Sequence, residues 1–127
     1  MGSRSNIAIH FGNDDHGQPQ RVYLYSHWDG EAIAKHLRDA CKAGARLDDA
    51  QYFARIVFQR MLGTDKGESG YGISPGICDN QYKVLVVNCD QDRVTVEDGE
   101  GNVVDGREWT LGAFGELDDD AAVAAMT

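Results

Sequence analysis

The stretch YLYSHWDG, residues 23–30, decides how this chain starts to fold. Its first three residues, two tyrosines around a leucine, favour a half-buried β-strand. Asp29 is a residue type that often caps the N-terminus of a helix, and the apolar residues after it recur with helical spacing. The stretch therefore predicts a strand that turns directly into a helix.

The residues before this stretch predict its partner strand. In residues 6–11 the side chains of Ile7, Ile9 and Phe11 alternate with smaller or polar ones, which is typical of a strand with one buried face. A polar loop over 12–20 is rich in turn-forming residues. We therefore expect residues 21–26 to pair with the first strand as an antiparallel hairpin.

Two helices are predicted after the hairpin. The first covers residues 30–43, where the apolar side chains form one stripe, and Gly44 ends it. The second begins after a cap at Asp48 or Asp49 and ends at Gly63. The short link between them predicts that the two helices are neighbours in space.

The second half of the chain predicts short strands. Residues 64–72 contain three glycines without periodicity and indicate a mobile loop. Pro75 confines the next apolar segment to a sheet edge, whereas the continuous apolar run over 82–89 favours the centre of a sheet. The further predicted strands cover 93–97, 103–104 and 109–111.

This order of elements predicts a single α+β domain over residues 1–117. It consists of an N-terminal β-hairpin, two consecutive α-helices and then an antiparallel β-meander, with the helices packed on one face of one sheet. Residues 118–127 are acidic and then alanine-rich, without a large hydrophobic side chain, so we expect a disordered tail.

The charge of the chain limits its partners. Its 127 residues include 21 acidic and 12 basic side chains, which gives a net charge of −9. Such a surface repels phosphates and argues against direct binding of nucleic acid, but it suits a partner protein with a basic, nucleic-acid-binding surface. Solubility alone explains the same acidity. We expect a cytoplasmic protein without membrane contact, because no apolar run reaches about 18 residues and no signal peptide is recognisable.

Motifs for catalysis, metals and cofactors are not found, so we assign no catalytic residue, no metal and no cofactor. Cys41, Cys78 and Cys89 lack the spacing of a zinc site or a disulfide framework and are expected to be free thiols. A nucleophile pair of Cys78 with His10 or His27 is the catalytic alternative, but the adjacent acidic residue disfavours a thiolate.

The corner between strand and helix is the best candidate for a ligand site. His27 and Asp29 can bind an anion or move a proton near a helix N-terminus, and Trp28 adds a large aromatic surface. Tyr25 and Arg4 are expected nearby. Packing of the corner explains the same residues without any ligand, and both interpretations stay open.

Two segments carry a family resemblance. Met1-Gly2-Ser3-Arg4-Ser5, and then Tyr25-Ser26-His27-Trp28-Asp29-Gly30 after one hairpin, resemble short, largely uncharacterised proteins of bacteriophages, prophages and plasmids. Those proteins typically begin MG[ST]R and carry a motif of Tyr, His or Gln, an aromatic residue, Asp, and Gly or Ser. The resemblance covers about the first 30 residues and ends at Glu31-Ala32, where Tyr-Pro is common in that group. It implies a mobile-element origin and brings no established activity.

These observations lead to two functional hypotheses. The first is a non-enzymatic protein that inhibits a host defence protein by occupying its surface, as anti-CRISPR-type inhibitors do. The second is a small-molecule or nucleotide-binding protein that uses His27, Trp28 and Asp29. Assembly into a homo-oligomer is left open.

Overall fold

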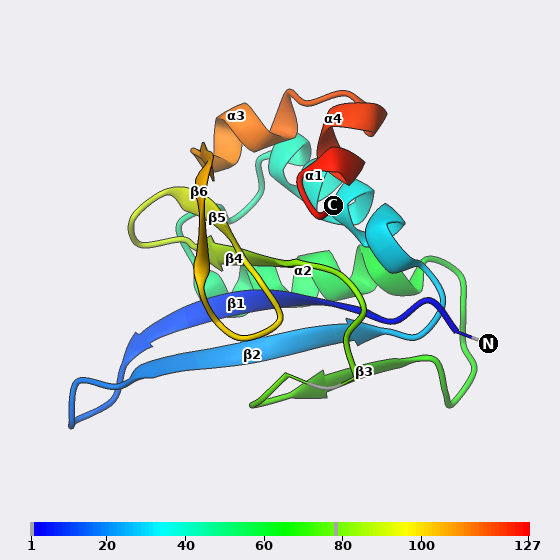
Figure 1. Cartoon of the computed structure of the whole chain (residues 1–127), viewed down its shortest axis with the longest axis horizontal. Helices are drawn as coiled ribbons and strands as arrows, with labels where there is room; N and C mark the ends of the chain where they lie inside the picture. Colours follow the sequence, from blue (N-terminus) through cyan, green and yellow to red (C-terminus); the bar gives the residue numbers. More distant parts are fainter. Residues whose placement is uncertain (1, 78) are drawn as a thin grey trace.

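The first strand of the N-terminal hairpin lies at the centre of a six-stranded sheet in the computed structural model, which describes residues 2–77 and 79–127 (Figure 1). The strand order is β3-β2-β1-β4-β5-β6. The strands are β1 (Ser5–Asn13), β2 (Pro19–Ser26), β3 (Tyr71–Ser74), β4 (Val84–Asn88), β5 (Arg93–Glu97) and β6 (Val103–Trp109). The helices are the 3₁₀ turn η1 (Gly30–Ala32), α1 (Ile33–Ala43), α2 (Ala50–Leu62), α3 (Leu111–Gly115) and α4 (Asp119–Ala124).

The helices cover one face of the sheet, as alternation along β1 predicts. Ile7 and Ile9 point into the main core, which includes buried residues of all four α-helices. Ala8, between them, belongs to a small second cluster on the opposite face with Val84 and Val86. The domain is therefore α+β with two layers, and the face opposite the helices is the open face of the sheet.

The sheet is mixed, which differs from the expected antiparallel arrangement at one junction. β4, β5 and β6 form the predicted antiparallel meander, but β4 pairs with β1 in parallel. The cause is the connection from β3 to β4. It passes the start of β1, where the Asn6 side chain donates a hydrogen bond to the Asp79 carbonyl (3.2 Å) and the Gln81 N–H donates to the Arg4 carbonyl (2.9 Å).

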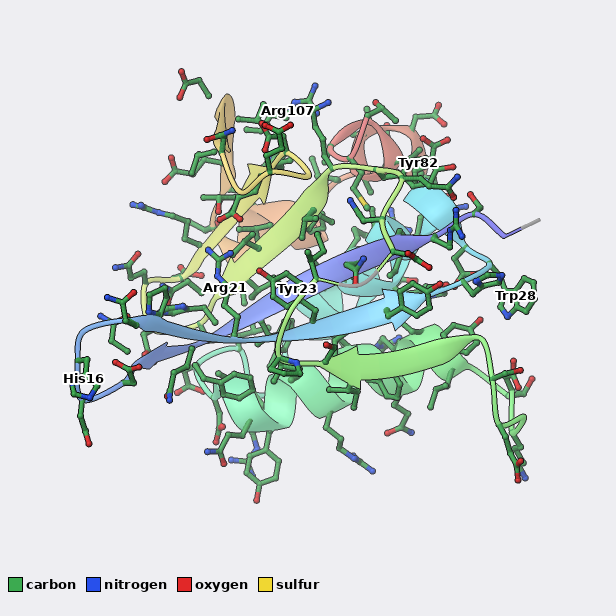
Figure 2. The ribbon with its side chains drawn as sticks, turned by 60° about the horizontal axis from the view of Figure 1, so that its bottom comes forward. His16, Arg21, Tyr23, Trp28, Tyr82 and Arg107 are labelled. Atoms are coloured by element: carbon green, nitrogen blue, oxygen red, sulfur yellow. The ribbon has the colours of Figure 1, made fainter. Side chains whose placement is uncertain are left out.

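A charged pair lies on the open face. The Arg21 guanidinium on β2 donates to both carboxylate oxygens of Glu97 on β5, at 2.9 and 2.7 Å. Arg21 also approaches the Tyr23 hydroxyl, and Figure 2 shows these two side chains together on this face. A fork-to-fork pair of this kind fixes the geometry of both side chains.

The predicted helix caps are confirmed at α2 and wrong at Asp29. Asp49 accepts a hydrogen bond from the Tyr52 N–H (3.4 Å), and Gly63 follows the last residue of α2. Asp29 has helical backbone angles (φ −82°, ψ −21°) and its side chain makes no capping bond. Instead, the Ser26 hydroxyl accepts from the Asp29 N–H (3.1 Å), because a capping side chain needs an extended backbone that Asp29 lacks here.

The expected disordered tail over residues 118–127 is wrong, because α4 packs on α1. Asp118 caps α4 by accepting from the Ala121 N–H (2.7 Å), and Ala122 and Met126 are buried in the main core. Arg38 on α1 donates to the Asp119 carboxylate (2.5 Å). Small alanine side chains let this short helix approach α1 closely, so a large hydrophobic stripe is not needed.

The predicted last strand over 109–111 is also wrong beyond Trp109. Trp109 ends β6, and the Thr110 side chain accepts from the Ala113 N–H (3.0 Å) as the cap of α3. In the described part of the chain, no helix has the length and apolar character needed to cross a membrane.

Candidate functional site

The predicted corner over residues 26–30 is tied to two other segments of the chain. The Ser3 N–H donates to the His27 carbonyl and the Gly30 N–H donates to the Ser3 carbonyl, both at 2.8 Å. The His27 N–H donates to the carbonyl of Gly70, just before β3, also at 2.8 Å. The corner is therefore held by backbone bonds from both sides.

Two glycines permit this close approach. Gly30 has φ +55°, and a Cβ atom there would lie 2.3 Å from the Ser3 hydroxyl oxygen. Gly70 has φ +95°, and a Cβ atom there would lie 2.1 Å from Nε1 of Trp28. Both positions need glycine for their backbone angle and for the space that a side chain would take.

The aromatic residues of the corner form a row. The Tyr25 hydroxyl lies 2.9 Å from Nδ1 of His27, and the His27 and Trp28 rings meet edge to face at 4.5 Å between centroids. Trp28 is nevertheless 54% exposed. Figure 2 places it beyond the end of β2, beside the start of β3. Trp28 is therefore a large aromatic side chain that is exposed to solvent, while hydrogen bonds and neighbouring rings hold its position.

The other two predicted site residues point elsewhere. Oδ2 of Asp29 lies 3.6 Å from Nε2 of His36 on α1. Nη1 of Arg4 lies 3.8 Å from the Asp79 carboxylate, on the connection between β3 and β4. Tyr25, His27 and Trp28 thus come together, whereas Asp29 and Arg4 each face a partner on another segment.

Backbone donors at the corner are already in use. The N–H groups of Trp28 and Asp29 approach the Ser26 hydroxyl, and that of Gly30 binds the Ser3 carbonyl. The next residue, Glu31, is acidic and lies in the first turn. An anion would have to displace these bonds and approach two carboxylates, so the corner is poorly arranged for a phosphate or a nucleotide.

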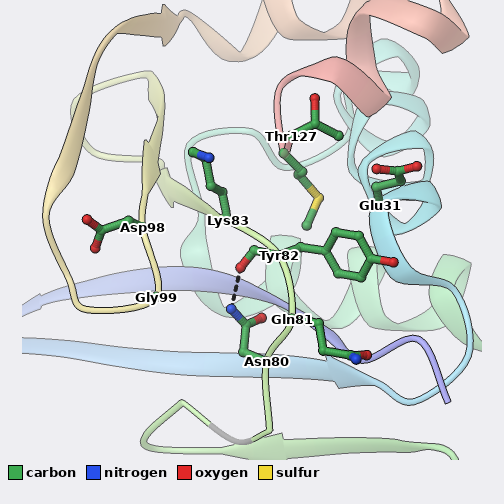
Figure 3. A pocket seen from close by; sticks show the side chains of 9 residues that line it. Glu31, Asn80, Gln81, Tyr82, Lys83, Asp98, Gly99 and Thr127 are labelled. Atoms are coloured by element: carbon green, nitrogen blue, oxygen red, sulfur yellow. Dashed lines mark hydrogen bonds between the residues drawn. The ribbon is translucent and has the colours of Figure 1, made fainter. Parts of the chain in front are cut away.

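A cavity of about 480 Å³ lies next to the corner (Figure 3). Its walls come from four segments that sequence reasoning did not connect, and it contains Glu31, Lys83 and Asp98 among amide and apolar groups. The Tyr82 hydroxyl in its wall is 2.7 Å from the Ser3 hydroxyl oxygen. Among the described residues, the lining holds no histidine or cysteine, and it combines one basic with two acidic side chains. The remaining lining residues are Asn80, Gln81, Gly99, Met126 and Thr127.

The cysteines that the structure describes are poor nucleophiles. Burial raises the pKa of the Cys41 thiol to about 12 and that of Cys89 to about 11. The neutral thiol therefore prevails at physiological pH. Cys78, the third cysteine and the proposed nucleophile of the catalytic alternative, lies outside the described residues. Within residues 2–77 and 79–127, no group of three or more His, Cys, Asp or Glu side chains is arranged to hold a metal ion.

Comparisons with protein-family models, with curated protein sequences and with solved structures found no match to this chain. Its function is therefore inferred from its own geometry.

Proposed function

We propose that this protein is a non-enzymatic binding protein that acts by occupying a surface of another protein, with Trp28 as the anchor of its docking surface. The observation that supports this is the exposure of Trp28 on a base fixed by Gly70 and His27. Tryptophan is among the side chains that contribute most to protein interfaces. An anchor that is already ordered loses little conformational entropy on binding.

The charge of the molecule supports a basic partner. The net charge is −9, and several of the basic side chains already pair with carboxylates of the same chain. The free carboxylates favour association with a positively charged surface and speed the encounter. The arginines in such ion pairs are Arg4, Arg21, Arg38 and Arg93.

The class of partner follows from the resemblance of the N-terminal motifs to bacteriophage proteins. On this proposal the partner is a host protein with a basic, nucleic-acid-binding surface, such as a component of a defence complex. Covering that surface would inhibit the host protein in the manner of an anti-CRISPR inhibitor, without chemistry.

A capture experiment tests the proposal. The immobilised full chain is incubated with bacterial lysate, and bound proteins are quantified by mass spectrometry for the wild type, Trp28→Ala and Tyr52→Ala. Tyr52 on α2 is a matched control, because this aromatic side chain is also 54% exposed. We expect a host protein that Trp28→Ala loses and Tyr52→Ala retains. Equal capture by both variants, or no capture by the folded wild type, would refute the proposal.

The alternative hypothesis, binding of a small molecule or nucleotide at the corner, predicts a different result. A nucleotide that bound the corner would raise the melting temperature by mass action, and His27→Ala would abolish the shift. We expect no shift with a panel of nucleotides, because the backbone donors at the corner are occupied within the chain.

A further inference from the structure

The two edges of the sheet differ in how they are protected. At one edge, β6 carries Asp105, Arg107 and Glu108. Gly106 has φ +81°, and the pairing register with β5 shifts along this strand. Charges and irregular pairing are the usual means by which proteins keep an edge strand from pairing with another chain.

The opposite edge, β3, is short and is followed by Pro75, but it carries neither a charged side chain nor a register shift. It pairs in regular register with β2, and no other strand of residues 2–77 and 79–127 covers its outer side (Figure 1). Residues 69–77 include no charged side chain. Ile73 on this strand is 62% exposed and Ile77 beyond it is 43% exposed. Trp28 lies beside its first end, so two exposed apolar side chains, Trp28 and Ile73, lie at this edge.

Carboxylates lie at both ends of this uncharged edge. At the start of β3, the exposed residues Asp65 and Glu68 precede Gly70, whose carbonyl accepts the bond from the His27 N–H (2.8 Å). Beyond the other end, Ile77 lines a cavity of about 220 Å³ on the open face of the sheet together with Asp98 and Glu100, so these carboxylates lie beside the turn that follows β3. An apolar edge with negative charge at each end is complementary to a segment that is apolar in the middle and basic at its ends.

We propose that the outer edge of β3 takes up an extended segment of the partner protein as a seventh strand, with apolar residues opposite Ile73 and lysine or arginine at both ends of the segment. This inference rests on the proposed function and names its binding mode. In strand addition the main-chain hydrogen bonds give affinity, and alternate side chains give specificity.

A second copy of the same chain is a poorer occupant. Two copies would bring net charges of −9 together, with carboxylates at the ends of both edges. Repulsion between these like charges opposes the association of two copies, whereas the same carboxylates attract a basic segment.

The test uses a fluorescent peptide, Lys-Lys-Val-Thr-Val-Thr-Val-Lys-Lys, titrated with the full chain. Its controls replace the lysines by glutamate, or the central valine by proline, which cannot complete a ladder of hydrogen bonds. We expect binding of the first peptide only. Ile73→Lys should weaken it by about tenfold or more, because a charge on the edge opposes strand addition. Val103→Lys is the matched control, since Val103 on β6 is also 62% exposed.

Three results would overturn the inference in variants that circular dichroism shows to be folded. They are no binding of the basic peptide, equal binding by Ile73→Lys and Val103→Lys, and dimerisation of the free wild type that Ile73→Lys abolishes. If the peptide fails to bind while capture from lysate still depends on Trp28, strand addition is wrong and the proposed function stands. If capture fails while the peptide binds as expected, the proposed function is wrong, but the conclusion that the β3 edge binds a basic strand remains.

Discussion

Gly30 joins the N-terminal segment to the start of the helices because it has no side chain. Its φ is +55°, and a Cβ atom would lie 2.3 Å from the Ser3 hydroxyl oxygen and 3.0 Å from the Tyr82 hydroxyl oxygen. We therefore expect Gly30→Ala to lower the free energy of unfolding by about 2–3 kcal/mol. Gly12→Ala is the control, since Gly12 has φ +99° with open space around it. Urea denaturation measures both, and equal losses would show that the contact with Ser3 is unimportant.

The burial of Cys41 and Cys89 predicts that both thiols react slowly in the folded protein. Because burial raises both thiol pKa values above the ordinary 9.0, these thiols stay protonated in the folded protein. In a Cys78→Ser background, iodoacetamide at pH 8 should modify them slowly in buffer and completely in urea. Mass spectrometry measures the extent of modification. Fast modification in buffer would contradict the burial of both thiols.

The same two thiols predict how stability depends on pH. Their pKa values are higher in the folded chain than in the unfolded chain, so between about pH 9 and pH 11 the unfolded chain releases protons that the folded chain keeps. Stability is therefore fully present below pH 9 and falls as the pH rises through this range. The double variant Cys41→Ala, Cys89→Ala should show a weaker fall in urea midpoint. If the urea midpoint of the double variant falls with pH as steeply as that of the wild type, groups other than these two thiols cause the loss of stability.

The corner itself was partly predictable from the sequence. Tyr25, His27 and Trp28 are near one another in the chain, so a strand followed by a turn already brings them together. The contacts that fix the corner were not predictable, since Ser3 and Tyr82 are 79 positions apart. Nothing in a local pattern shows that Gly70 would contact Trp28.

At the scale of elements, the sequence predicted those that depend on local periodicity and caps. The helix expected over 30–43 is η1 followed by α1, and the second helix ends before Gly63 as expected. The parallel pairing of β1 with β4 could not be predicted, because a strand's apolar pattern does not reveal its neighbour. α4 was missed because its alanines carry little hydrophobic signal, although Met126 after it is buried.

The C-terminal segment is held against α1 mainly by Met126 and Ala122. Met126 is 1% exposed in the main core. Truncation to alanine should therefore cost about 2–4 kcal/mol of unfolding free energy, because it leaves a cavity. Val123→Ala on α4 is the control and should cost less, because Val123 is only partly buried. Urea denaturation measures both, and a negligible loss for Met126→Ala would mean that residues 118–127 do not pack against α1.

The net charge of the whole molecule bears on the proposed binding. In that proposal, the net charge of −9 attracts a basic partner over a long range, and the exposed side chains around β3 make the short-range contacts. The attraction depends on ionic strength, because salt screens exposed charges beyond a Debye length of about 10 Å at 0.1 M. Raising the salt from about 50 mM to about 500 mM should therefore slow the association of the captured partner several-fold. An association rate that does not change with salt would show that the negative charge of the chain does not contribute to binding.

We propose that the protein binds another protein through Trp28 and the outer edge of β3, and this binding can be measured. Hydrogen exchange of the complex with the captured host protein, measured by mass spectrometry against the free chain, tests it most directly. We predict slower exchange of the amides of β3, residues 71–74, with α2 unchanged, because the new main-chain hydrogen bonds form along that edge. Protection over α2 or over the cavity beside Tyr82, with β3 unchanged, would contradict binding at the edge of β3.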